Sequence, residues 1–239
     1  VDRGSAAYSR IRALLAEAPV VKDGQASLPA GRGVLNVAIR EFRYPHAARD
    51  TLRNVQFSLK PGQMLGLCGP TGAGKTSVLS LIQRHFDLDQ GEITFHDVPL
   101  DRVHLDDWRG RLAVVNQTPF LFSDTVASNI ALGKPDATQE EIEQAAKLAC
   151  VHDDILRLPQ GYDTQVGERG VMLSGGQKQR ISIARAMLLE AEILVLDDAL
   201  SAVDGRTEHQ ILHNLRQWGE NRTVIISAHR LSALTEASE

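Results

Sequence analysis

The sequence predicts an α/β fold: an open parallel sheet, an antiparallel β lobe before it and a helical lobe inserted into it. Three observations lead to this prediction. They are alternating apolar positions near the start, short apolar runs that end in polar or glycine-rich residues, and helical periodicity between two of those runs. With 239 residues, 43% of them hydrophobic, the chain is long enough to bury a full core.

Alternation of apolar and polar residues at 34–42 and 52–59 predicts two antiparallel strands. Pro61 and Gly62 then mark a turn before the next apolar run. We expect this part of the chain to form a β lobe beside the main sheet.

Buried parallel strands are predicted by four short apolar runs, which cover residues 64–68, 112–115, 193–196 and 224–227. Open sheets of this kind bind their ligands beyond the carboxyl ends of the strands. We therefore expect the functional residues to gather at that edge.

A mostly helical lobe is predicted from about residue 118 to 185. Thr138 and Glu141 have the spacing of a capping box, in which each side chain bonds the backbone of the other residue. Ile142 and Ala145 follow at helical spacing.

Composition excludes several classes of protein. The net charge of -4 gives no basic footprint, so we expect no nucleic acid partner. Cys68 and Cys150 lack the spacing of a metal or redox motif, and we expect both to be small buried hydrophobic residues. No apolar run approaches the roughly 18 residues of a membrane span. The chain as given is expected to be soluble.

A phosphate-binding loop is predicted where the pattern GxxxxGK[ST] lies between an apolar run and a helical run. Its residues are Gly69, Pro70, Thr71, Gly72, Ala73, Gly74, Lys75 and Thr76, followed by Ser77. The N–H groups of such a loop surround phosphate oxygens, and the helix dipole favours the anion. We expect Lys75 to reach the β and γ phosphates of ATP, and Thr76 to bind Mg²⁺. These features predict a P-loop NTPase with a RecA-like core.

Asp197 and Asp198 directly follow the apolar run 193–196. Adjacent carboxylates at the end of a buried strand are costly unless a cation or phosphate chemistry uses them. We expect Asp197 to hold the shell of the Mg²⁺ ion, through water, and Asp198 to orient the attacking water. A surface-exposed turn is the alternative.

Residues 173–180, Leu-Ser-Gly-Gly-Gln-Lys-Gln-Arg, open another predicted helix, with Ser174 and Gln177 as a capping box. The helix start is a second potential anion site. Alone it would usually be only a helix cap. Together with the phosphate loop and the acidic pair, this motif makes the sequence resemble the nucleotide-binding domain of an ABC transporter. The resemblance covers the chain from about residue 20 to the end.

The resemblance implies how ATP would be held. In that family two domains pair head to tail, and each ATP lies between the phosphate loop of one domain and the signature motif of the other. On this likeness the residues that serve the partner's ATP are Ser174, Gly175, Gly176 and Gln177. Ser201 and Asp204 would belong to the loop that crosses the dimer interface.

Three further residues match the family one by one. Tyr44 resembles the aromatic residue that stacks on adenine, with an ordinary strand tyrosine as the alternative. Gln117 resembles the glutamine that senses Mg²⁺, with a plain loop amide as the alternative. His229 resembles the switch histidine at the γ-phosphate, with a structural histidine as the alternative. The resemblance thus implies that Lys75, Gln117, Asp198 and His229 are catalytic.

Residues 118–122 and 164–170 resemble exporter elements that touch a transmembrane domain. Core packing of Phe120 and Phe122 is the alternative. The whole match is close to bacterial multidrug-resistance-like ATP-binding proteins that form one half of a heterodimeric exporter. The implied partners are a second, different ABC ATP-binding domain and a transmembrane domain of the same polypeptide. The resemblance also implies that the full-length protein places this domain at the cytoplasmic face of the bacterial inner membrane.

The chain departs from the family pattern in two ways. The family usually has Glu where this chain has Asp198, and the shorter side chain is expected to impair general-base assistance but not ATP binding. The chain also stops soon after His229. We expect residues 31–239 to be a C-terminally truncated ABC ATP-binding domain, whose missing C-terminal elements lower its stability. We expect residues 1–30 to be a linker from an absent transmembrane domain.

Three functions are considered. The preferred one is the ATPase motor that powers export of a small or lipophilic compound, with a degenerate ATP site of its own. The alternative is a regulatory ATP-holding module with little turnover. An ABC-type ATPase acting on DNA is disfavoured, because the interval between phosphate loop and signature has neither heptads nor paired cysteines.

Overall fold

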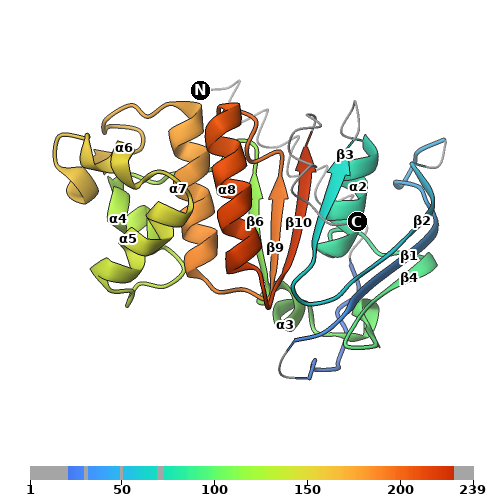
Figure 1. Cartoon of the computed structure of the whole chain (residues 1–239). Coiled ribbons are helices and arrows are strands. Elements are labelled where there is room, and N and C mark those ends of the chain that lie inside the picture. Colours follow the sequence, from blue (N-terminus) through green and yellow to red (C-terminus); the bar gives the residue numbers. More distant parts are fainter. Residues whose placement is uncertain (1–20, 30–31, 49–50, 69–72, 229–239) are drawn as a thin grey trace, which may run out of the picture.

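The computed structural model describes residues 21–29, 32–48, 51–68 and 73–228. Figure 1 shows a helical lobe at one end, a central sheet flanked by helices, and an antiparallel β lobe at the other end. The predicted α/β architecture is thereby confirmed.

Among the described residues, the central sheet has four parallel strands in the order β3-β10-β9-β6. Their bounds are Met64–Cys68 for β3, Leu112–Asn116 for β6, Ile193–Asp197 for β9 and Thr223–Ala228 for β10. Residues 193–196 are fully buried, as expected for a strand covered on both faces. The register pairs Ser227 with Asp197 and Ala228 with Cys68. The carboxyl ends of β3, β9 and β10 therefore share one edge, as predicted.

The β lobe has the strand order β2-β1-β4-β5. Its bounds are Leu35–Phe42 for β1, Leu52–Leu59 for β2, Gln90–Phe95 for β4 and Val98–Pro99 for β5. Strands β1 and β2 pair antiparallel, as the alternation predicted. Strand β4 was not predicted, because it begins with the exposed polar stretch Gln90, Gly91 and Glu92 and has little apolar pattern.

The helical lobe lies against the sheet through one long helix. The α-helices are α2 (Ala73–Ile82), α3 (Leu105–Arg109), α4 (Val126–Ile130), α5 (Gln139–Leu148), α6 (His152–Leu156), α7 (Gly175–Leu188) and α8 (Gly205–Trp218). Two 3-10 helices, η1 (Leu100–Arg102) and η2 (Gly161–Asp163), and a short pair of strands, β7 (Asp124–Thr125) and β8 (Gln165–Val166), complete the elements. Helix α7 packs against α4, α5 and β6. Both predicted capping boxes, at the starts of α5 and α7, are confirmed.

Residues 21–29 are hydrogen-bonded to the body of the domain. The N–H of Leu28 donates to Oδ2 of Asp107 in α3 at 2.8 Å. In the same helix, the indole N–H of Trp108 donates to the carbonyl oxygen of Ile82, the last residue of α2, at 2.7 Å. Helix α3 thus binds both the segment 21–29 and the carboxyl end of α2.

The two cysteines differ from the expectation. Cys68 is exposed and Cys150 is only partly buried. Strand β3 lies at the edge of the described sheet, and its last residue leaves the packed interior at the carboxyl end. The prediction of burial is therefore wrong for Cys68. Burial raises the pKa of the Cys150 thiol.

Candidate functional site

The acidic pair lies at the carboxyl edge of the central sheet. Asp197 is the last residue of β9, and Asp198 follows it with a left-handed φ of 53°. Ser227 of β10 binds both residues. Its Oγ donates to Oδ1 of Asp197 at 2.9 Å, and its carbonyl oxygen accepts the N–H of Asp198 at 3.1 Å. Ser227 was not singled out from the sequence, although a polar residue in the apolar run 224–227 is a usable signal.

Lys75 reaches the same edge from the first turn of α2. It is only 7% exposed, and its Nζ donates to the carbonyl oxygen of Ala228, the last residue of β10, at 3.1 Å. Because β10 lies between β3 and β9, this bond places the ammonium group at the strand ends that carry the acidic pair. Thr76, the next residue, is exposed. Residues 69–72 lie outside the described part of the chain.

Tyr44 is brought from the β lobe to the phosphate-loop helix. Its hydroxyl shares a 2.7 Å hydrogen bond with Oγ of Ser77, a fully buried residue of α2. Its ring makes edge-on contacts with Phe42 and Phe86, with ring centroids 5.0 Å apart in each case. The structure thus places Tyr44 beside α2, and stacking on adenine stays a prediction.

A cavity of about 180 Å³ lies beside Asp198. Ser201, Ser227 and Glu208 also line it, and Glu208 is only 2% exposed. Leu200, Ile226 and Ala228 make up the apolar rest of the lining, and the volume leaves room for water, which occupies about 30 Å³ per molecule in the liquid. Glu208 was not predicted, because it lies in a polar, otherwise exposed helix turn that gives no sequence signal.

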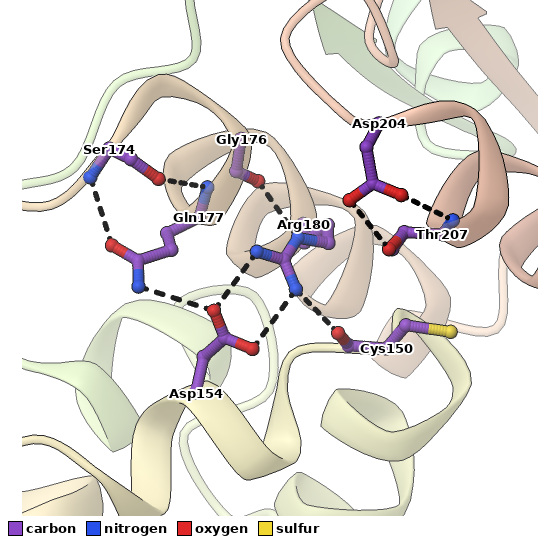
Figure 2. Close-up of polar contacts among 8 residues, drawn as sticks. All are labelled: Cys150, Asp154, Ser174, Gly176, Gln177, Arg180, Asp204 and Thr207. Atoms are coloured by element: carbon purple, nitrogen blue, oxygen red, sulfur yellow. Dashed lines mark hydrogen bonds and ion pairs between the residues drawn. The ribbon is translucent and has the colours of Figure 1, made fainter.

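The start of α7 is fixed by its capping box and by α6, as Figure 2 shows. Oγ of Ser174 accepts the N–H of Gln177 at 3.1 Å, and Oε1 of Gln177 accepts the N–H of Ser174 at 2.9 Å. The side chain of Gln177 also donates to Asp154 at 3.2 Å. Arg180 donates to both carboxylate oxygens of Asp154, at 3.3 and 3.1 Å, and to the carbonyl oxygen of Cys150 at 2.6 Å. The predicted signature residues are thus held in a fixed orientation.

Asp154 is charged in this network. Burial acts to raise its pKa, but the hydrogen bonds from Arg180 and Gln177 and the charges of Arg180 and Arg157 hold the pKa below its usual range. A carboxylate with a lowered folded-state pKa stabilises the fold above its unfolded pKa of about 3.9. This contribution is lost as the pH falls through the folded-state pKa.

The predicted interface loop packs against the signature helix. Asp204 caps α8, accepting the backbone N–H and the hydroxyl of Thr207, both at 2.9 Å, and these bonds lower the pKa of Asp204 (Figure 2). A Cβ atom added to Gly176 would lie 2.7 Å from the carbonyl oxygen of Ala202. Gly176 therefore has a structural reason to be glycine, namely the close approach of the segment 201–204.

Replacing Gly176 with alanine is expected to destabilise the domain by up to about 2 kcal/mol. Overpacking against backbone typically costs about 1–3 kcal/mol, and the better helix propensity of alanine returns about 1 kcal/mol. Gly205→Ala is the control, since a Cβ at Gly205 meets nothing within 4 Å. Chemical denaturation of both variants measures the difference. Equal stability of the two variants would contradict the close approach at Ala202.

Gln117 and Ser201 bind one side chain that the sequence did not reveal, that of Gln179. Gln179 is 2% exposed, and its Nε2 donates to the carbonyl oxygen of Gln117 at 2.8 Å and to Oγ of Ser201 at 2.9 Å. Its Oε1 accepts the N–H of Ala202 at 2.9 Å. A polar residue on the buried face of a predicted helix is the signal that would have identified it.

The two segments that resemble exporter elements meet in space. Pro119 and Leu121 of the first segment and Gly167 and Glu168 of the second line one cavity of about 350 Å³. Its lining includes Phe120, which is 73% exposed, and Met172, which is 92% exposed. Phe120 therefore does not pack in the core, whereas Phe122 is partly buried. Exposed apolar side chains around a hollow are typical of a docking surface.

Two further features bear on function. In the described part of the chain, no group of three or more His, Cys, Asp or Glu side chains is placed to hold a metal ion. Mg²⁺ bound with a nucleotide needs only one or two protein ligands, and the Thr76 hydroxyl and the Asp197 carboxylate are oxygen ligands of the preferred kind. No helix within the described ranges has the length and apolar character needed to cross a membrane. His229 lies outside those ranges, and its role stays a prediction.

Comparison with known proteins identifies relatives of the whole chain. The model of the ABC transporter family matches residues 52–201. The multidrug resistance-like ATP-binding protein MdlA of Escherichia coli (strain K12) is 77% identical over 239 residues, which are 100% of this chain and 40% of that protein. The probable multidrug resistance ABC transporter ATP-binding/permease protein YheI of Bacillus subtilis (strain 168) is 42% identical over 99% of this chain and 41% of its own length. The chain thus spans about two fifths of these relatives.

Solved structures agree with these relatives. The structure of a bacterial Atm1-family ABC exporter with ATP bound superposes with a TM-score of 0.83 at 36% identity, covering 99% of this chain and 41% of that chain. Fold, phosphate-loop helix, signature helix and family match all point to one assignment: the chain belongs to the ABC transporter family, as an ATP-binding domain.

Proposed function

We propose that the chain is the ATP-binding and hydrolysing motor domain of an ABC exporter, which uses ATP to power export of a small or lipophilic compound. The observation that carries the proposal is the convergence of Lys75 and the acidic pair on the last residues of β10. Lys75 bonds Ala228, and Ser227 bonds Asp197. A P-loop ATPase needs an ammonium group for the phosphates and a carboxylate for the magnesium shell at one place.

The residues at this edge would act in different steps. Lys75 binds the β and γ phosphates, and the exposed Thr76 hydroxyl and Asp197 hold the magnesium shell, with Asp197 acting through water. When bound, Mg²⁺ would neutralise the negative charge that develops on the phosphate oxygens. Asp198 would orient the attacking water and accept its proton, and the side chain of Gln117, directly after β6, would contact the magnesium shell. His229 would contact the γ-phosphate.

The chain's own ATP site is proposed to be degenerate. Aspartate is one methylene shorter than the glutamate usual in the family. The N–H of Asp198 is bound by both the carbonyl oxygen and Oγ of Ser227, at 3.1 and 3.2 Å. These bonds hold the backbone in place, so it does not advance to make up the missing length. Asp198 also favours the alternative, a regulatory ATP-holding module, whose signature completes a competent site on a different subunit.

Two partners follow from this proposal. A second ABC ATP-binding domain, of a different subunit, would face Ser174, Gly175 and Gly176 with its own ATP. A transmembrane domain of the same polypeptide would insert into the hollow beside Phe120 and Met172. The assembly would lie at the cytoplasmic face of the bacterial inner membrane.

Mg-ATP hydrolysis measured over a wide range of protein concentrations tests the proposal. Because each site is completed by a second domain, the rate per molecule is expected to rise with concentration. An equimolar partner domain with an intact glutamate should raise it further. A rate per molecule that stays constant upon dilution and is unaffected by the partner would contradict shared sites. Hydrolysis that stays slow even with the partner would favour the ATP-holding module.

A further inference from the structure

We propose that Gln179 is a positioning residue that ties the Gln117 segment of the chain's own ATP site to the segment 201–204 at the partner's ATP site. The inference rests on the proposed function, because it assumes two ATP sites shared between two domains. Gln179 is placed to act through its neighbours on both sides. It is therefore not a catalytic residue in the sense of touching ATP.

The hydrogen-bonding capacity of Gln179 is used on both segments. Its amide nitrogen has two hydrogens, one for the carbonyl oxygen of Gln117 and one for the hydroxyl of Ser201, at 2.8 and 2.9 Å. Its amide oxygen accepts the N–H of Ala202 at 2.9 Å. Gln179 itself is 2% exposed, whereas Gln117, Ser201 and Ala202 are exposed, so moving one segment alone would leave a buried amide atom of Gln179 without its partner.

Ala202 is hydrogen-bonded to α7 at one point and lies close to it at another. Its N–H is bound by Gln179, and its carbonyl oxygen lies where a Cβ on Gly176, one turn earlier in α7, would be 2.7 Å away. We therefore expect the segment 201–204 to move with the first turns of α7. The same helix carries the signature residue Ser174 as its N-cap.

The Gln117 end of the tie lies directly after β6, whose last residue pairs with Asp197 of β9. The carbonyl oxygen of Gln117 is thus close in sequence to the strand edge that carries the acidic pair. A shift of this backbone when ATP binds at the chain's own site would be transmitted by Gln179 to Ser201 and Ala202. Hydrogen-bond networks can carry energetic coupling between distant sites, and Gln179 supplies one such connection.

The test is Gln179→Glu in the intact transporter, compared with Gln210→Glu. Glutamate keeps the acceptor for Ala202 but has no hydrogen to donate to Gln117. Gln210 is an exposed glutamine of α8 that donates to Asn214 at 2.9 Å, so the control makes the same chemical change away from the tie. We expect kcat for ATP hydrolysis to fall by roughly ten- to a hundredfold, as for a misplacement of about 1 Å. ATP affinity and KM should stay within about twofold, and Gln210→Glu should match the parent.

Gln179→Met, which has similar length and no hydrogen-bonding amide, gives an independent readout. Hydrogen exchange of peptides that cover residues 200–204 should be faster than in the parent, because the Ala202 N–H loses its acceptor. Unchanged exchange together with unchanged kcat would overturn the proposal. So would a rise of KM at constant kcat, or unfolding of both Gln179 variants, which would make Gln179 a residue needed only by the core.

ATP binding by the Lys75→Met variant of the same transporter tests the proposed function separately from the role of Gln179. Loss of ATP binding in that variant supports the ATP site itself. If Lys75→Met still bound ATP while the Gln179 variants behaved as expected, the assigned ATP site would be wrong rather than the tie. If Lys75→Met lost ATP binding and Gln179→Glu behaved like Gln210→Glu, the tie alone would be overturned.

Discussion

Replacing Lys75 with methionine is expected to weaken ATP binding by a factor on the order of 100 or more. Methionine keeps most of the buried stem but removes the ammonium group that bonds Ala228 and is proposed to reach the phosphates. Losing one partner of a buried, hydrogen-bonded charge pair costs about 2–5 kcal/mol. Titration with a fluorescent ATP analogue in the presence of Mg²⁺ measures the affinity.

Lys147→Met is the matched control for this change, because Lys147 is an exposed lysine of α5 in the helical lobe. It is expected to leave the affinity for ATP unchanged. Thermal unfolding of both variants shows whether the fold is retained. Equal ATP affinity of Lys75→Met and the parent would contradict the role assigned to the phosphate-loop helix.

Replacing Asp198 with glutamate is expected to raise ATP hydrolysis by about ten- to a hundredfold at unchanged ATP affinity. The added methylene moves the carboxylate toward the attacking water by about 1 Å, a displacement that can change a rate by a factor of order 100. Steady-state hydrolysis at saturating Mg-ATP, at a protein concentration where pairing is complete, gives the comparison. ATP binding needs no general base and should not change.

Asp198→Asn is the control that separates charge from shape. It keeps the length of the side chain, and asparagine also tolerates the left-handed φ of 53° at this position, but it removes the base. Its hydrolysis should fall below that of the parent. If parent and glutamate variant were equally fast, Asp198 would be a sufficient base and the site would not be degenerate.

The fold was predictable because its signals are local. The apolar runs at 193–196 and 224–227 became β9 and β10, and the capping spacing at Ser174 began α7 as expected. Strand β4 was missed because it begins with exposed polar residues. Helix α8 was missed although Ile211, Leu212 and Leu215 have helical spacing after the cap at Asp204, which is a usable signal. Cys68 was misjudged because its exposure depends on where β3 lies in the sheet.

A candidate site could be proposed from the sequence only where one segment carries the chemistry. The phosphate loop, the acidic pair and the signature are each continuous in the sequence, whereas the residues that support them are not. Asp154 and Arg180 are 26 residues apart, and Gln179 is 62 residues from Gln117. Such pairs have no spacing rule, because their separation depends on the loops between elements.

A pulling force applied at residue 21 would follow a short mechanical path through the domain. It would load the bond from Leu28 to Asp107, pass along α3, and reach the carboxyl end of α2 through Trp108 and the carbonyl oxygen of Ile82. The opposite end of α2 carries Lys75. Tension at residue 21 would thus be applied to the phosphate-loop helix itself.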